Sequence, residues 1–192
     1  MDYLESTENY MNPEQFKIVL DAIPKLKIRK WFDYDVVMLF KIQYECALRP
    51  IEGIKLSKED FNIKDRIIYL GKTKTSKGDK VVIPKNFTYE LENYLVEKDN
   101  GRLFKDLTYN TYFRWIIRLG EILNIKAWTT PESESGEKTK GHIFRKSKGK
   151  DLLKEIGLNE LDIISKHLRH SKPSITFDSY LKASTEAVKQ RI

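Results

Sequence analysis

The chain has 192 residues, a length that suits a single domain of comfortable size. Hydrophobic residues make up 40% of it, and a net charge of +7 favours a polyanionic partner. Cys46 is the only cysteine, which excludes an internal disulfide and a multi-cysteine metal site and indicates a reducing compartment. The sequence contains no apolar run of about 18 residues and no signal peptide, so we expect a soluble intracellular protein with no membrane association.

The first helix has a clear start signal. Asn12 is followed by Pro13, which suits the first helical position, and by Gln15 at the third, so the three residues are typical of a capped helix. Residues 1–11 before it are expected to form a flexible N-terminal arm, and Pro24 to end or bend the helix.

A second helix is predicted from Asp33. Its apolar residues fall nearly all round, which indicates a buried central helix. Pro50 disfavours helical geometry at Arg49, so the helix should stop there, and a short helix over 51–56 follows.

The period of the hydrophobic pattern then changes. Short β-rich segments occupy 61–63, 67–70 and 81–83, and 76–79 has the composition of a hairpin turn. The chain should therefore adopt an α+β fold, mainly α-helical, with one small three-stranded antiparallel sheet.

The rest of the chain is predicted to be helical around one polar loop. A helix over 87–98 comes first, and Asn110 is expected to cap the next, which runs through Leu123. The inner side of that helix should carry Phe113, Ile116, Ile117 and Ile122. A surface loop is expected over 129–140. The later helices are expected at His142–Ile156, Asn159–Leu168 and Pro173–Tyr180, with a tail from Ser184.

Positive charge and histidine gather at the C-terminal end. The stretch from Lys140 to Ile192 holds twelve Lys and Arg against six Asp and Glu, and all three histidines. Phosphodiester cleavage without a metal needs a nucleophile, cations for the phosphate oxygens and an acid for the leaving oxygen. Arginine suits the second task because its fork holds two oxygens at once.

Two arginines and a histidine fit that scheme. His142 and Arg145 are three residues apart, so on a helix they would share a face, although a Lys-rich surface helix would look the same. Arg49 lies in an apolar context, where it could serve a site or simply complement a helix dipole. His167 and His170 could form a metal pair, but no carboxylate or cysteine stands at ligand spacing.

A tyrosine and two lysines complete the candidates. Tyr180 could act as nucleophile if a base or a positive site activates it, whereas an isolated tyrosine more often packs. Lys72 and Lys74 lie near the predicted hairpin tip, where a lysine could reach DNA as an acid or could simply be solvated.

The order of these residues resembles that of the tyrosine recombinases, the phage-integrase family. The sequence 47–56, ALRPIEGIKL, is similar to the first arginine box of the family, and 71–75, GKTKT, to its lysine hairpin. The second box resembles 142–145, HIFR, and the third resembles 168–171, LRHS, followed by Tyr180. The resemblance covers about 12–180.

The resemblance implies a DNA strand transferase that works through a 3′-phosphotyrosine intermediate. The implied catalytic residues are Arg49, Lys74, His142, Arg145, His170 and Tyr180. The residues expected to bind DNA are Lys72, Lys77, Lys146, Lys148, Arg169 and Lys172. Lys74 is favoured over Lys72 as the acid, and no cofactor or metal is implied.

Several wider expectations follow from the same resemblance. The partner would be double-stranded DNA, bound by a tetramer on recombination sites or by a monomer if the domain is isolated. Residues 12–192 would form the catalytic domain, without the N-terminal DNA-clamping domain of full recombinases. DNA relaxation of the type IB topoisomerase kind and a basic DNA-binding module without catalysis remain alternatives.

Overall fold

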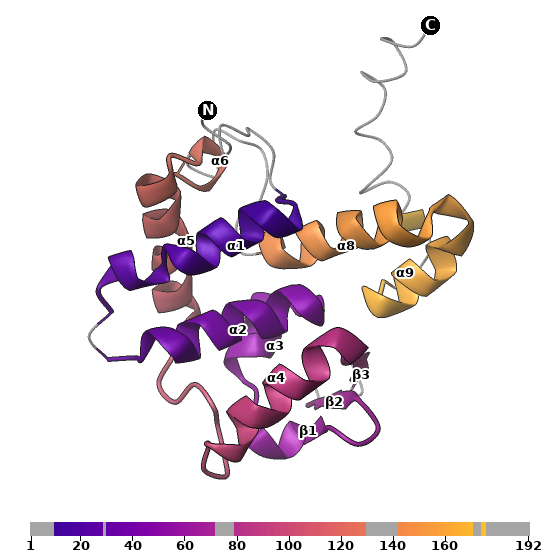
Figure 1. Ribbon diagram of the computed structural model, residues 1–192, viewed down its shortest axis with the longest axis horizontal. Coiled ribbons are helices and arrows are strands. Elements are labelled where there is room, and N and C mark those ends of the chain that lie inside the picture. The colour runs from indigo at the N-terminus through magenta and orange to yellow at the C-terminus, as the bar shows by residue number, and fades with distance from the viewer. Residues whose placement is uncertain (1–9, 29, 72–78, 130–141, 171–173, 176–192) are drawn as a thin grey trace, which may run out of the picture.

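The computed structural model describes residues 10–28, 30–71, 79–129, 142–170 and 174–175 (Figure 1). Its α-helices are α1 (Pro13–Asp21), α2 (Asp33–Glu45), α3 (Pro50–Ile54), α4 (Lys85–Val96), α5 (Tyr109–Leu123), α6 (Lys126–Thr129), α8 (Ile143–Ile156) and α9 (Leu161–His167). Short 3-10 turns are η1 (Ile23–Leu26), η2 (Lys58–Asp60) and η4 (Leu158–Glu160), and the strands are β1 (Phe61–Asn62), β2 (Ile67–Leu70) and β3 (Asp79–Val82).

Helix α2 is the buried centre of the molecule, as the sequence predicted (Figure 1). Leu39 and Phe40 face one apolar cluster, which α1, α5 and the start of α8 complete. Met38 and Ile42 face a second cluster, formed with the sheet and α4. Because α2 is covered on both sides, it fixes the position of the chain that leaves its C-terminal end.

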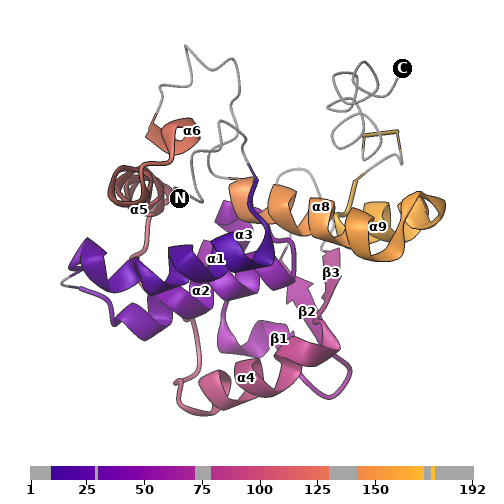
Figure 2. The same cartoon turned by 45° about the horizontal axis from the view of Figure 1, so that its top comes forward.

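The predicted three-stranded antiparallel sheet is confirmed, with strand order β1-β2-β3. Ile68 and Val81 pair across the two longer strands and point into the α2–α4 cluster. Tyr69 and Lys80 pair on the other face, where the Lys80 ammonium lies 5.4 Å from the ring centroid. Figure 2 shows the sheet lying next to α9.

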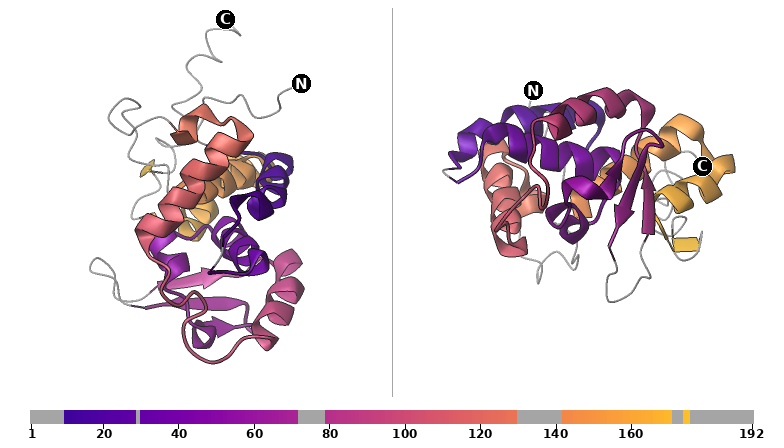
Figure 3. Two further views of the ribbon diagram at one scale, coloured as in Figure 1. Left: turned by 90° about the vertical axis from the view of Figure 1, so that its left-hand side faces the viewer. Right: turned by 90° about the horizontal axis from the view of Figure 1, so that it is seen from below.

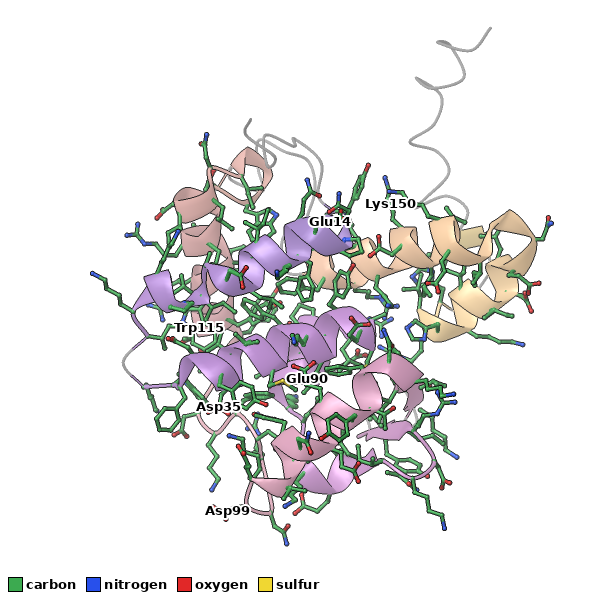
Figure 4. The ribbon with its side chains drawn as sticks, viewed as in Figure 1. Glu14, Asp35, Glu90, Asp99, Trp115 and Lys150 are labelled. Carbon is green, nitrogen blue, oxygen red and sulfur yellow. The ribbon has the colours of Figure 1, made fainter. Side chains whose placement is uncertain are left out.

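The start of α1 agrees with the sequence prediction, whereas Met11, predicted to belong to the N-terminal arm, packs into the core. The Asn12 side chain accepts a hydrogen bond from the Gln15 amide, and the Gln15 side chain accepts one from the Asn12 amide. Met11 is buried, and its amide donates to Ser147 Oγ at 2.8 Å. The chain is therefore anchored to α8 before α1 begins, and Figure 4 labels Glu14 on α1 and Lys150 on α8.

The predictions for α5 need two corrections. Thr108, and not Asn110, caps the helix, because its side chain accepts a hydrogen bond from the Thr111 amide. The fully buried face also differs from the predicted one, since Phe113 and Ile117 are only partly buried. The buried residues are Tyr112, Trp115, Ile116, Leu119 and Gly120.

Helices α8 and α9 lie near the C-terminal end of α2. Helix α8 packs against α2, and α9 folds back beside α8 (Figure 3). The predicted helix 159–168 is instead a 3-10 turn followed by the shorter α9, because Gly157 at φ 82° ends α8 and redirects the chain. Within the described ranges, no helix is long and apolar enough to cross a bilayer.

Candidate functional site

The site begins where α2 ends. Ala47 has a φ of 48°, a left-handed conformation that favours glycine. Its amide donates to the Tyr44 carbonyl at 3.2 Å, and the Leu48 amide donates to the Gln43 carbonyl at 2.9 Å, which together form a Schellman cap. The cap turns the chain so that Arg49 enters α3 in an extended conformation, as the following proline predicted.

The end of α9 repeats this construction. Arg169 has a φ of 51°, and its amide donates to the Lys166 carbonyl at 3.0 Å. The amide of His170 donates to the Ser165 carbonyl, also at 3.0 Å, which gives a second Schellman cap. Arg49 and His170 therefore each leave a helix through the same kind of turn.

Arg145 connects the two helix ends. Its Nη1 donates to the Ala47 carbonyl at 2.8 Å, and its Nη2 donates to the carbonyl of Leu168. Arg145 is only 5% exposed, so it supplies hydrogen-bond donors to these two carbonyls at a place that water does not reach. The negative ends of two helix dipoles also favour a guanidinium at this place.

His142 lies beside Arg145, whose charge lowers its pKa. It is the residue before α8, with φ −98° and ψ 9°, whereas the sequence predicts a helix that starts at His142. The helix begins one residue later because His142 occupies the N-cap position.

Glu52 contacts two arginines of the site, Arg49 and Arg169. Its Oε1 accepts a hydrogen bond from Arg49 Nη1 at 2.8 Å, and its Oε2 accepts one from the Arg49 amide at 2.7 Å. The same Oε2 lies 2.5 Å from Arg169 Nη2, and Arg169 Nε lies 3.2 Å from Asp79 Oδ2. One buried carboxylate is therefore shared by two guanidinium groups from distant parts of the chain.

The histidines of the site are kept neutral. Burial lowers the pKa of His142, and the charges of Arg145 and Arg49 lower it further. Burial also lowers the pKa of His170 to about 4, with the charges of Arg145, Arg49 and Arg169 acting in the same direction. At neutral pH the positive charge of the site therefore lies on the guanidinium groups, and both imidazoles can accept a proton or a hydrogen bond.

This arrangement suits an anionic ligand with several oxygens. The side chain of Arg49 is 39% exposed, so it can meet a ligand, whereas those of Arg145 and Arg169 are buried. A guanidinium fork can hold two phosphate oxygens. Among the described residues, no group of three or more His, Cys, Asp or Glu side chains could hold a metal ion, and His167 does not join His170 in one.

Comparison with known families identifies the chain. The profile of the Phage integrase family matches residues 9–187, which is most of the sequence. The chain belongs to the phage integrase family. This match includes every residue of the site described above.

Solved structures of recombinases share the fold of this integrase-family chain. The XerH site-specific recombinase in a post-cleavage complex has a TM-score of 0.69 at 20% identity, covering 94% of this chain and 52% of XerH. The XerA recombinase has a TM-score of 0.65 at 20% identity, covering 95% of this chain and 64% of XerA. The catalytic domain of bacteriophage HP1 integrase has a TM-score of 0.63 at 17% identity, covering 92% of this chain and 93% of that domain.

The shared region is the catalytic domain and not the whole length of the longer recombinases. This chain spans about half the length of XerH but nearly the whole HP1 catalytic domain. At these identities the likeness concerns the fold, which is the mainly helical catalytic fold with a small antiparallel sheet that the sequence predicted.

The structure brings together five of the residues singled out from the sequence. These are Arg49, His142, Arg145, Arg169 and His170. Five further candidates lie outside the described residues, and these are Lys72, Lys74, Lys77, Lys172 and Tyr180. The predicted turn at 76–79 and the predicted loop over 129–140 also lie almost wholly outside them, as do the helix 173–180 and the tail from Ser184.

The two lysines predicted on α8 have different surroundings. Lys146 is half-buried, and its charge helps to lower the pKa of His142, so it lies beside the site. The Lys148 side chain is 14% exposed, and its ammonium pairs with Glu45 Oε2 at 2.9 Å. The structure thus gives Lys148 an ion pair with α2, and its contact with DNA stays a prediction.

Sequence reasoning missed the polar contacts that join α2 to α8. Besides the Lys148 pair, the Tyr44 hydroxyl donates to the Asp151 carboxylate. Burial and this hydrogen bond raise the pKa of Tyr44 well above its usual range. An Asp and a Lys three residues apart on a Lys-rich helix look like solvated residues, so only the packing against α2 reveals them.

Proposed function

We propose that the chain is the catalytic part of a site-specific tyrosine recombinase, which cleaves and rejoins DNA through a 3′-phosphotyrosine link. The observation that supports this most strongly is the convergence of Arg49, Arg145, His142 and His170 at two bridged helix ends in a chain of the phage integrase family. Double-stranded DNA is the partner, and XerH, which shares this fold, was solved bound to its palindromic difH substrate.

The arginines hold the scissile phosphate. Arg49 is the exposed one, and its fork meets two non-bridging oxygens, where negative charge grows during attack. Arg145 is fixed at the base of the site by the two helix-end carbonyls, and it supplies a second positive charge there. This arrangement stabilises the transition state without a metal.

Histidines of the site, together with Tyr180 and Lys74, carry out the proton transfers of the reaction. Tyr180 attacks phosphorus, its proton passes toward the neutral His142, and His170 donates a hydrogen bond to a phosphate oxygen. Lys74 protonates the leaving 5′-oxygen. The phosphotyrosine link conserves the energy of the broken bond, so strands are exchanged and resealed without ATP. A tetramer on paired sites would carry out the exchange.

A nicked suicide substrate tests this function. Duplexes that the full chain selects from a random pool would be nicked close to the cleavage position, so that the released fragment cannot religate. Wild type should accumulate a covalent protein–DNA adduct, and binding should weaken steeply with salt because Lys and Arg contacts release counterions. DNA binding without an adduct would show a binding module that lacks catalysis.

Variants and a second assay sharpen the test. Arg49→Ala should lower the cleavage rate by about a hundredfold or more, comparable to the loss of an oxyanion-hole donor. Arg118→Ala is the matched control, because its guanidinium pairs with Glu121 on an exposed helix face. Strand transfer between two sites supports recombination, whereas supercoil relaxation alone would indicate a topoisomerase.

A further inference from the structure

Arg169 departs from the rest of the site in its backbone and its burial. Its φ of 51° is a conformation in which glycine is comfortable and an arginine is strained. Its side chain is nevertheless 5% exposed, although a long cation at a helix end normally extends into water. Contacts made by the side chain must offset both costs.

Those contacts join three segments of the chain. Arg169 Nη2 lies 2.5 Å from Glu52 Oε2 on α3, and its Nε lies 3.2 Å from Asp79 Oδ2 at the start of β3. The cap of α9 sets the direction from which the guanidinium enters. Figure 3 shows α9 and β3 next to each other, as these contacts require.

The effect of Arg169 on Arg49 passes through Glu52. Glu52 is buried and bonds both the Arg49 guanidinium and the Arg49 amide. If Arg49 were its only cationic partner, the pair would be neutral and the carboxylate would compete with a phosphate for Arg49. A second guanidinium on Oε2 gives the Glu52 carboxylate another cationic partner, so it draws less on Arg49, and it fixes the carboxylate that orients Arg49.

We propose that Arg169 is a positioning residue, which clamps Glu52 between two guanidinium groups and so holds Arg49 in the orientation that meets the phosphate. This role rests on the proposed function and adds to it a residue that acts through Glu52. Asp79 is more exposed than Glu52, so it is the weaker partner and ties the clamp to the sheet.

Three substitutions at Arg169 separate the effect of its side chain from the effect of its backbone conformation. Arg169→Gly removes the clamp and relieves the backbone, so the fold is kept. Arg169→Met keeps a long side chain and removes the charge, and Arg169→Lys keeps the charge without the fork. We expect Gly and Met to slow covalent cleavage of the nicked duplex about tenfold to a hundredfold, as a misplaced phosphate ligand does, and Lys to recover part of the loss. Wild-type rates in Arg169→Gly would overturn the proposal.

Salt dependence distinguishes positioning from direct contact with DNA. Nη1 and Nε of Arg169 are buried without a hydrogen-bond partner among the described residues, the Nε contact with Asp79 being an ion pair only, so a direct phosphate contact is the rival. A lost phosphate contact lowers the slope of log K against log salt concentration by about 0.9. We expect the slope of Arg169→Met to equal that of wild type and of the control Arg118→Met. A slope reduced by that amount would overturn the positioning role.

A thermal double-mutant cycle tests the clamp without any cleavage. Glu52→Gln and Arg169→Met should each lower Tm, and together they should lower it by clearly less than the sum of the two shifts. Additive shifts would show that the clamp does not exist. If the shifts couple but wild type forms no adduct, the proposed function fails and the positioning role fails with it. If wild type cleaves and the Arg169 variants cleave equally well, only the positioning role fails.

Discussion

Removing Arg145 should lower both stability and cleavage, whereas removing Arg49 should lower cleavage and leave stability nearly unchanged. The buried Arg145 guanidinium donates to the carbonyls of Ala47 and Leu168, which end two Schellman caps. A hydrogen bond from a charged donor contributes about 1.5–3 kcal/mol, so Arg145→Ala should cost roughly 3–6 kcal/mol of the free energy of unfolding. For a chain of this size that corresponds to a Tm lower by about 6–24 °C.

Arg49→Ala provides the comparison. The Arg49 side chain is 39% exposed and pairs with Glu52, which keeps its contact with Arg169. We expect a cost of about 0–1 kcal/mol, because the Arg49 end of the pair is exposed and Glu52 keeps a second cationic partner. Urea and thermal unfolding of the two variants measure the difference. If Arg145→Ala unfolded within about 1 kcal/mol of Arg49→Ala, the bridging of the two helix ends would not contribute to stability and the reasoning would be refuted.

Three further predictions concern the packing around the site. Lys148→Met should cost about 2 kcal/mol because it leaves Glu45 poorly paired, and adding Glu45→Gln should recover much of that loss in urea unfolding; equal losses in both would exclude the pair. The pKa of His167 is lowered to about 4, so the unfolded state binds more protons below pH 6.5, and His167 should contribute a fall in the free energy of unfolding of at most about 1.4 kcal/mol per pH unit between pH 6.5 and 4. An unchanged pH slope in His167→Gln would contradict this. Gly53→Ala would place a Cβ 2.6 Å from the Gln43 amide nitrogen, so it should cost about 1–3 kcal/mol, and unaltered stability would show that Gln43 moves aside freely.

Local signals in the sequence were enough to predict most elements and the site motifs. The cap at Asn12, the apolar surface of α2 and the proline after Arg49 each depend on neighbouring residues, and each prediction is confirmed. The sheet followed from three short β-rich runs, since antiparallel strands close in sequence pair with their neighbours.

The partners of the charged residues could not be predicted, because they come from contacts between distant segments. Arg145 bonds a carbonyl 98 residues away in sequence, and Arg169 pairs with Glu52 at a separation of 117 residues. Nor does a lysine such as Lys148 show in sequence whether it faces water or a neighbouring helix. The difference at His142 has a local cause, since this residue occupies the N-cap position and α8 begins at Ile143, one residue later than predicted.

The central claim is that this chain cleaves DNA through one tyrosine, and mapping the covalent link tests it most directly. The adduct formed on a nicked duplex would be digested with nuclease and protease, and the peptide that keeps a nucleotide would be sequenced by mass spectrometry. We predict a single modified residue, Tyr180, and no adduct in Tyr180→Phe while DNA binding persists. A link to another residue, or an adduct that survives Tyr180→Phe, would contradict the claim.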